Sequence, residues 1–258
     1  MPDKAEEILV IAPRGLRDFL VATGRMRCLR RLHPNARITA LAAPRFLDTA
    51  QRSGYFDDIV LSIPRSWLSL LGKRFARVYD LRAAADAGHP LFRHFLRGRP
   101  LWVPPPESSL PDISWMTAGG DKEDIAAAFG LKKPYVLLLA GASLRHPEKN
   151  WLPRRYAALA LKLAREGFQP VLTGTDDDAA MAEGVLRVCP EARDLCGLTS
   201  LCDIAALADG AAAAVGHDTG AAVLTALTGC PTQVIFPQER VGAVYRAFTP
   251  RTGESHAA

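Results

Sequence analysis

Short runs of apolar residues recur along the chain, separated by longer segments with apolar residues at helical spacing. Residues 8–12 form the first run, and they predict a buried strand because every position is apolar over the length of a strand. A helix is expected from about Asp18, with Leu20 and Met26 on its apolar face and most arginines outside. Further strands are expected at residues 38–42, 59–63 and 77–81, with a helix at 44–52. The first half therefore alternates strand and helix, which predicts a Rossmann-like layer.

The alternation stops between residues 83 and 118, where three consecutive prolines mark a loop and little regular structure is expected. A helix at residues 121–129, which Asp121 could cap, precedes a linker at 132–134. The second half begins with a strand at 135–140 and a helix from Pro153, a favoured first helical residue. It continues with a strand at 169–173, a helix capped by Ser200, and strands at 211–215 and 232–236. We therefore expect two α/β domains, at residues 1–131 and 132–258.

The segment from Ala211 to Pro231 carries the clearest functional signal. It predicts a strand, a sharp loop at residues 216–220 containing Asp218-Thr219-Gly220, an Ala-rich helix and a second strand. Ligands of parallel sheets bind beyond the carboxyl ends of the strands, and a helix N-terminus favours an anion there. The alternative is that Asp218 and Thr219 only cap the helix and that Gly220 only lets it pack closely. An aspartic protease site is set aside because the flanks are helical and the motif occurs once.

Composition places the chain among globular proteins. Of its 258 residues, 48% are hydrophobic and 23% charged. No apolar run has the length of a membrane span, and the acidic N-terminus is unlike a signal peptide, so we expect a cytoplasmic protein. The five cysteines lack the spacing of a zinc site or a disulfide framework and are expected to be reduced.

The net charge is +5, and the basic excess lies in the first half. Six arginines and one acid, Asp18, lie between positions 14 and 31, and eight basic residues outnumber two acids between positions 65 and 99. Such a surface suits an anionic partner: a phosphorylated sugar, an anionic lipid or nucleic acid. No nucleic acid partner is expected, because no known binding motif is present. For any single arginine, a solvated basic surface is the simpler explanation.

Four pieces of the second half stand in a recognisable order. They are Gly141-Ala142-Ser143 with Lys149-Asn150-Trp151-Leu152-Pro153 behind it, Val171-Leu172-Thr173-Gly174 with acids after it, residues 194–201, and Asp218-Thr219-Gly220 followed by a helix, Gly229 and Pro231. Together they resemble the heptosyltransferases, glycosyltransferase family 9. The first half is similar more loosely, through the loop Gly15-Leu16-Arg17-Asp18 and the segments 33–39 and 56–60. The resemblance runs from about Ile8 to Pro237.

The resemblance implies an α/β fold of the GT-B type, in which two Rossmann-like domains with parallel sheets face each other across a cleft. It implies transfer of heptose from ADP-heptose to the lipopolysaccharide core or a related anionic glycan, with inversion and without a metal ion. The implied donor-binding residues, in the second domain, are Ser143, Lys149, Asp218, Thr219 and Gly220. The implied acceptor-binding residues, in the first domain, are Arg14 and Arg17. No cofactor is expected, because the ADP-sugar is a substrate, and a glycolipid acceptor would allow peripheral contact with the inner membrane.

Asp18 is the candidate general base. An acceptor hydroxyl is a poor nucleophile at neutral pH, and its attack on the anomeric carbon requires removal of its proton. Asp18 follows the first strand and is the only acid between Glu7 and Asp48. The alternative is that Asp18 only caps the helix that it precedes. The acids at 176–178 are interpreted as helix-start charges, so no metal ligands are expected.

Departures from the family pattern leave a second hypothesis open. Val223 stands where the family usually has a His near the donor phosphates, and the middle of the first domain is compressed. In the first loop, Arg17 stands where Gly is usual. Only 22 residues follow Phe236, so the second domain is expected to be truncated at its end. The alternative is a non-catalytic nucleotide-sugar-binding relative of the same fold. A dehydrogenase and a P-loop nucleotidase are disfavoured because neither glycine motif is present, whereas an epimerase of the same architecture stays open.

Overall fold

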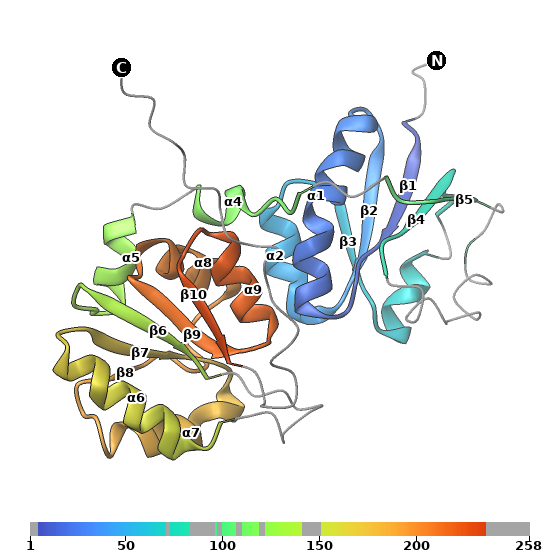
Figure 1. The fold of residues 1–258 in the computed structure, drawn as a ribbon. Coiled ribbons are helices and arrows are strands. Elements are labelled where there is room, and N and C mark those ends of the chain that lie inside the picture. Colours follow the sequence, from blue (N-terminus) through green and yellow to red (C-terminus); the bar gives the residue numbers. More distant parts are fainter. Residues whose placement is uncertain are drawn as a thin grey trace, which may run out of the picture. The chain divides into compact units, whose positions relative to one another are not determined.

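The computed structural model describes residues 5–70, 73–82, 96, 100–106, 110–118, 122–140 and 151–235. The chain divides into two compact units, Met1–Met116 and Thr117–Ala258. Each unit has its own parallel sheet and is described by itself (Figure 1).

The first unit contains a five-stranded parallel sheet in the order β3-β2-β1-β4-β5. Its elements are β1 (Glu7–Ile11), α1 (Leu16–Leu32), β2 (Arg37–Ala42), the 3-10 turn η1 (Pro44–Phe46), α2 (Leu47–Arg52), β3 (Asp58–Leu61), the 3-10 segment η2 (Pro64–Leu70), β4 (Arg77–Asp80), β5 (Leu101–Val103) and α4 (Ser114–Thr117). The chain runs outward from β1 to β3 and then returns to the other side of β1 with β4. The strand order therefore reverses between β1 and β4, which is where open α/β sheets bind ligands.

The central strand β1 explains why this sheet forms. Leu9 pairs with Thr39 of β2 on one side and with Val78 of β4 on the other. Ile8, Leu9 and Val10 are fully buried, so the strand is covered on both faces, as in a doubly wound fold.

The second unit repeats the arrangement with the order β10-β9-β6-β7-β8. Its elements are α5 (Lys122–Ala128), β6 (Tyr135–Leu139), α6 (Pro153–Arg165), β7 (Gln169–Thr173), the 3-10 turn η5 (Asp176–Asp178), α7 (Ala179–Leu186), β8 (Arg193–Asp194), α8 (Leu201–Gly210), β9 (Ala213–His217), α9 (Gly220–Leu227) and β10 (Thr232–Ile235). All of its strand pairs are parallel. The order reverses between β6 and β9, so the switch point of this sheet lies beyond the carboxyl ends of those two strands.

Alternation along β6 divides the core of the second unit into two layers. Tyr135, Leu137 and Leu139 pack with residues of α5, α8 and α9, whereas Val136 and Leu138 pack with residues of α6 and α7. Figure 1 shows these helices on opposite faces of the sheet. All five residues of β6 are buried, which matches its continuous apolar sequence.

In the described part of residues 83–118, regular structure is limited to the three-residue strand β5 and the four-residue helix α4, which agrees with the expectation of little regular structure. The expected loop at residues 216–220 needs correction: it begins later, because Gly216 and His217 complete β9.

The division between the units falls before α5, whereas we expected a boundary after residue 131. Ala126 of α5 belongs to the core of the second unit, and Phe129 and Leu131 pack against it. This packing assigns the helix to the second sheet. The assignment of acceptor and donor to the two halves stays a prediction.

No helix in the described ranges is both long and apolar enough to cross a bilayer. All five cysteines are free thiols.

Candidate functional site

The candidate site of the second unit lies beyond the carboxyl ends of β6 and β9. Gly216 of β9 is paired with Leu139 of β6, and a Cβ at Gly216 would lie 2.5 Å from the Cβ of Leu139. A larger residue at this position would therefore push the two strands apart. Glycine permits their close approach at the switch point of the sheet.

The Asp218-Thr219-Gly220 segment joins β9 to α9. Thr219 is the N-cap of α9, and its side chain accepts a long hydrogen bond of 3.5 Å from the Ala222 N–H. The Thr219 N–H donates to the His217 carbonyl at 2.7 Å, which ties the turn to the end of the strand. The capping role expected for Thr219 is therefore confirmed.

Gly220 and Asp218 behave differently from Thr219. Gly220 is the first residue of α9, and its backbone lacks the positive φ found at Gly197 and Gly229. A left-handed turn therefore does not explain the glycine at this position. Asp218 is exposed beside the helix N-terminus and is not the N-cap residue.

His217 was not among the expected site residues, although it precedes Asp218 directly. Its Nε2 accepts a hydrogen bond of 2.8 Å from the backbone N–H of Trp151, and its Nδ1 lies 3.2 Å from the hydroxyl of Tyr156. The Tyr156 hydroxyl also donates to the Leu139 carbonyl at 3.0 Å. Since Nε2 is an acceptor, the ring proton belongs on Nδ1. Both ring nitrogens of His217 and the Tyr156 hydroxyl then have hydrogen-bond partners.

Three aromatic rings surround these hydrogen bonds. The ring centroids of Trp151 and Tyr156 lie 5.7 Å apart, and each ring is inclined steeply to that of His217. His217 is 4% exposed, and its burial lowers the pKa of the imidazole. Burial likewise raises the pKa of the Tyr156 hydroxyl. Both side chains are therefore neutral at pH 7.

The acids after β7 act as helix-start residues, as expected. Thr175 and Asp178 form a capping box, in which the Thr175 N–H donates to Asp178 Oδ2 at 2.8 Å. Asp178 is 4% exposed and so faces the protein. A Cβ at Gly197 would lie 1.8 Å from Asp176 Oδ1, which explains a glycine there. In the described part of the chain, no group of three or more His, Cys, Asp or Glu residues is arranged to hold a metal ion.

Two expected donor-binding residues, Ser143 and Lys149, lie outside the described residues. Trp151 is the first described residue after them, and it begins the approach to α6. Pro153 occupies the first turn of α6, as expected from the sequence.

The expected residues of the first unit lie at the carboxyl end of β1. Gly15 is the N-cap of α1 and Asp18 lies in the first turn, so the cap interpretation of Asp18 is wrong. The helix was expected from about Asp18, two residues too late, because Leu16 and Arg17 follow Gly15 and were interpreted as part of the loop. Asp18 is exposed, and no hydrogen bond or ion pair joins it to another described residue. A Cβ at Gly15 would lie 3.0 Å from Asp18 Oδ2, so glycine leaves space for this carboxylate.

Arg45 is a third basic residue at this edge, besides Arg14 and Arg17, and the sequence did not single it out. It follows β2, donates a hydrogen bond to the Arg14 carbonyl, and lies 5.1 Å from the centroid of the Phe46 ring. The contact brings Arg45 beside the loop that precedes Arg17 and Asp18. The sequence could have indicated Arg45 through its position shortly after the strand expected at residues 38–42.

Several other basic residues of the first unit are paired with acids. Arg27 lies 3.3 Å from Asp112, and Arg30 lies 2.5 Å from Asp57. Arg37, Arg77 and Arg82 also have carboxylate partners. These five arginines are therefore neutralised by neighbouring acids, and for Arg82, whose side chain is 8% exposed, the expected solvated basic surface is wrong.

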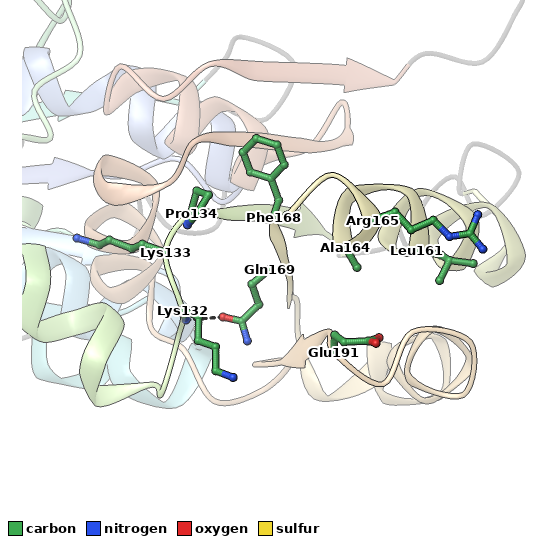
Figure 2. Close-up of a pocket in the computed structure, with 10 residues that line it drawn as sticks. Lys132, Lys133, Pro134, Leu161, Ala164, Arg165, Phe168, Gln169 and Glu191 are labelled. Carbon is green, nitrogen blue, oxygen red and sulfur yellow. Dashed lines mark hydrogen bonds between the residues drawn. The ribbon is translucent and has the colours of Figure 1, made fainter.

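A cavity of about 530 Å³ lies at the opposite, amino edge of the second sheet. Lys132, Lys133 and Arg165 contribute its positive charge, and Glu191 its negative charge. In Figure 2, Lys133 and Arg165 extend in opposite directions, so their head groups do not converge on one point. The cavity is therefore not the site expected beyond the carboxyl ends of the strands.

Residues 97–241, more than half of the chain, match the sequence model of glycosyltransferase family 9 (heptosyltransferase). The matched range contains His217 with its partners Trp151 and Tyr156, and the Asp218-Thr219-Gly220 segment. No curated protein matches the chain.

Solved structures share the fold at low sequence identity. ADP-heptose lipopolysaccharide heptosyltransferase II of E. coli is 22% identical, with a TM-score of 0.67 over 89% of this chain and 84% of that one. The heptosyltransferase WaaC of E. coli, solved with ADP, is 17% identical, with a TM-score of 0.58 over 88% and 86%. UDP-GlcNAc 2-epimerase of Methanocaldococcus jannaschii is 8% identical, with a TM-score of 0.53 over 88% and 82%. The expected α/β fold of the GT-B type is confirmed, and the epimerase shows that the fold alone does not determine the reaction.

Proposed function

The chain belongs to glycosyltransferase family 9, and on this premise we propose that it transfers a sugar, heptose, from an ADP-sugar to an anionic glycan of the lipopolysaccharide-core type. The reaction inverts the anomeric carbon and uses no metal ion. The family match over residues 97–241 is the observation that carries this proposal. The heptosyltransferase structures support it through their shared fold.

The donor binds to the second unit, with its diphosphate at the N-terminus of α9. Backbone N–H groups in the first turn of a helix and the helix dipole both favour a bound anion. Lys149 adds a positive charge to the diphosphate from the segment before Trp151. WaaC was solved with ADP, which supports an adenine nucleotide as the donor carrier.

The acceptor binds to the first unit, where Arg14 and Arg17 meet its acidic groups. An acceptor hydroxyl oxygen attacks the anomeric carbon while the bond from that carbon to the diphosphate oxygen breaks. The hydroxyl proton passes to the Asp18 carboxylate, and ADP leaves. Lys149 and the N-terminus of α9 stabilise the charge that develops on the leaving diphosphate.

Val223 supports a second candidate function, a relative that binds a nucleotide-sugar without turnover. It stands at the position where the family usually has a His, and its side chain is 6% exposed in α9. An apolar residue there cannot contact a phosphate by hydrogen bonding. The two functions differ in whether sugar reaches an acceptor.

Calorimetry with ADP, UDP and GDP tests the donor. We expect binding of ADP in preference to the others, and Lys149→Ala should weaken it by roughly ten- to a hundred-fold because a charge-assisted contact is lost. Lys162→Ala is the matched control, since Lys162 is an exposed lysine of the same unit whose Nζ lies 3.8 Å from Glu166. Equal ADP affinity in wild type and Lys149→Ala would refute this placement, and absence of nucleotide binding would refute the function.

A further inference from the structure

The loops after the first two strands of the first unit lie side by side at the carboxyl edge of its sheet. The Ala12 N–H donates to the Leu41 carbonyl at 3.0 Å, so β1 and β2 stay paired up to the point where the loops begin. Arg45 lies in η1, shortly after β2, and its guanidinium donates to the Arg14 carbonyl in the loop after β1. The side chain of Arg45 therefore reaches the loop that leads to Asp18.

Aromatic packing fixes the orientation of this guanidinium. Its central carbon lies 5.1 Å from the centroid of the Phe46 ring, an arrangement that attracts a cation to the ring. Phe46 in turn stacks on Phe19 with ring centroids 4.5 Å apart, and both residues are 1% exposed. Phe19 follows Asp18 directly in α1. Arg45 is therefore tied to the helix whose first turn carries the proposed base.

The charge of Arg45 is not neutralised by the surrounding chain. The side chain is exposed, and no ion pair joins it to an acid in the part of the first unit that the structure describes. Arg37 shows the contrast, because its Nε lies 2.9 Å from Asp58 Oδ2. A guanidinium carries five N–H donors in a planar fork, and the Arg14 carbonyl accepts from one nitrogen only. The remaining donors can bind both oxygens of a carboxylate or a phosphate.

An exposed arginine often serves only to hold a loop by such a bond. Arg45 differs from that simple case in two respects. Its head group is held by the Arg14 carbonyl and the Phe46 ring before any ligand binds, which lowers the entropy that ligand binding would cost. It also lies at the carboxyl edge of a parallel sheet, where ligands of such sheets bind.

We propose that Arg45 is a specificity-determining residue of the acceptor site and that it binds an acid group of the acceptor, a carboxylate or a phosphate. This inference rests on the proposed function, which assigns the acceptor to this edge of the first unit. Two oxygens of the acid group accept hydrogen bonds from the free donors of the guanidinium. The bond to the Arg14 carbonyl holds the acid group at a fixed place relative to the loop before Asp18. An acceptor without the acid group loses this contact, so Arg45 favours anionic acceptors.

Transfer kinetics with three acceptors test the inference: the unmodified glycan, the same glycan with its carboxylates esterified, and the same glycan with its phosphates removed. For the unmodified acceptor, Arg45→Ala should raise KM by roughly ten- to a hundred-fold, because a charge-assisted contact is lost. The Kd for ADP and kcat should stay the same. With the acceptor that lacks the bound group, wild type and Arg45→Ala should have equal KM, which identifies that group as carboxylate or phosphate. Arg45→Lys keeps the charge without the fork and should give an intermediate KM.

A role limited to holding the loop gives a different result. Loss of the Arg14 contact would then change KM or kcat by the same factor with all three acceptors. That result would overturn the inference, as would an unchanged KM for the unmodified acceptor. Arg45→Lys carries the same comparison if Arg45→Ala does not fold. Arg52→Ala is the matched control, because Arg52 is an exposed arginine of α2 whose Nε lies 3.0 Å from Asp48, and it should leave KM unchanged.

Anion binding without turnover distinguishes failure of this inference from failure of the proposed function. If the wild type transfers no sugar, the proposed function fails, and the charge of Arg45 is still tested with inorganic phosphate as the probe. Titration followed by NMR of the arginine side chains should shift the Nε–H signal of Arg45 with saturation. The signal of Arg37 should stay in place, because Asp58 already accepts from that nitrogen. Absence of a saturable shift at Arg45 would overturn the inference.

Discussion

Asp18→Asn provides a sharp test of the proposed mechanism in the first unit. Asparagine has the size of aspartate but cannot take up the proton of an acceptor hydroxyl. Asp18 is exposed in the first turn of α1 and has no hydrogen bond or ion pair to another described residue. The substitution therefore changes the chemistry of one exposed carboxylate and no packing contact of the described chain.

The expected effects on stability and on rate differ widely. An exposed carboxylate in the first turn of a helix stabilises the helix by about 0.3–1 kcal/mol through the helix dipole, so the loss of stability should not exceed that value. A positioned general base contributes about 10²- to 10⁴-fold to the rate, so kcat for sugar transfer should fall by that factor. The Kd for ADP should stay the same, because the donor binds to the second unit.

The assay follows ADP release with saturating donor and acceptor, alongside calorimetry with ADP and thermal unfolding. Asp48→Asn is the matched control, because Asp48 is an exposed acid in the first turn of α2 and pairs with Arg52 at 3.0 Å. It should leave kcat unchanged. Transfer by Asp18→Asn at the wild-type rate would refute the assignment of Asp18 as the base.

The remaining predictions concern stability, pH and metal ions. Hydrogen bonds from Arg37 and Lys73 lower the pKa of Asp58 to about 2, so the stability it contributes is present above the ordinary value of 3.8 and is lost as the pH falls from about 4 to 2. In urea unfolding over this pH range, the wild type should lose about 1–2 kcal/mol more unfolding free energy than Asp58→Asn loses. An equal loss in both proteins would contradict the assignment. Asp112 is 8% exposed and accepts from the Tyr55 hydroxyl at 2.6 Å, so Asp112→Ala should destabilise the first unit by about 2–3 kcal/mol in urea unfolding followed by hydrogen exchange of α1. A loss below about 0.5 kcal/mol would show that the buried carboxylate is not needed. Sugar transfer should be undiminished in excess EDTA, whereas loss of activity that magnesium restores would contradict the metal-independent mechanism.

Much of the fold follows from local sequence patterns. The apolar run at residues 8–11 makes up most of β1, and β6 is apolar throughout. The expected range of β7 agrees with the structure at both ends. Ser200 was expected to cap α8, and its Oγ accepts from the Asp203 N–H at 3.1 Å. These features depend on neighbouring residues, which is why the sequence predicts them.

Features that depend on distant residues could not be predicted. Gly216 resembles a loop residue, yet it lies in β9, where Leu139 of the adjacent strand leaves no space for a Cβ. The hydrogen-bond partners of the His217 ring lie more than sixty residues away in the sequence. A histidine at the end of a strand next to Asp218 was the available signal, but its neutral, doubly bonded state follows only from tertiary packing.

The most direct test of the proposed activity is a transfer reaction with ADP-heptose and a lipopolysaccharide acceptor that lacks heptose, followed by mass spectrometry. The wild type should add one heptose to the acceptor and release one equivalent of ADP. The product should have the anomeric configuration opposite to that of the donor. Tight binding of ADP with no heptose on the acceptor would contradict the account and identify the chain as a non-catalytic binding protein.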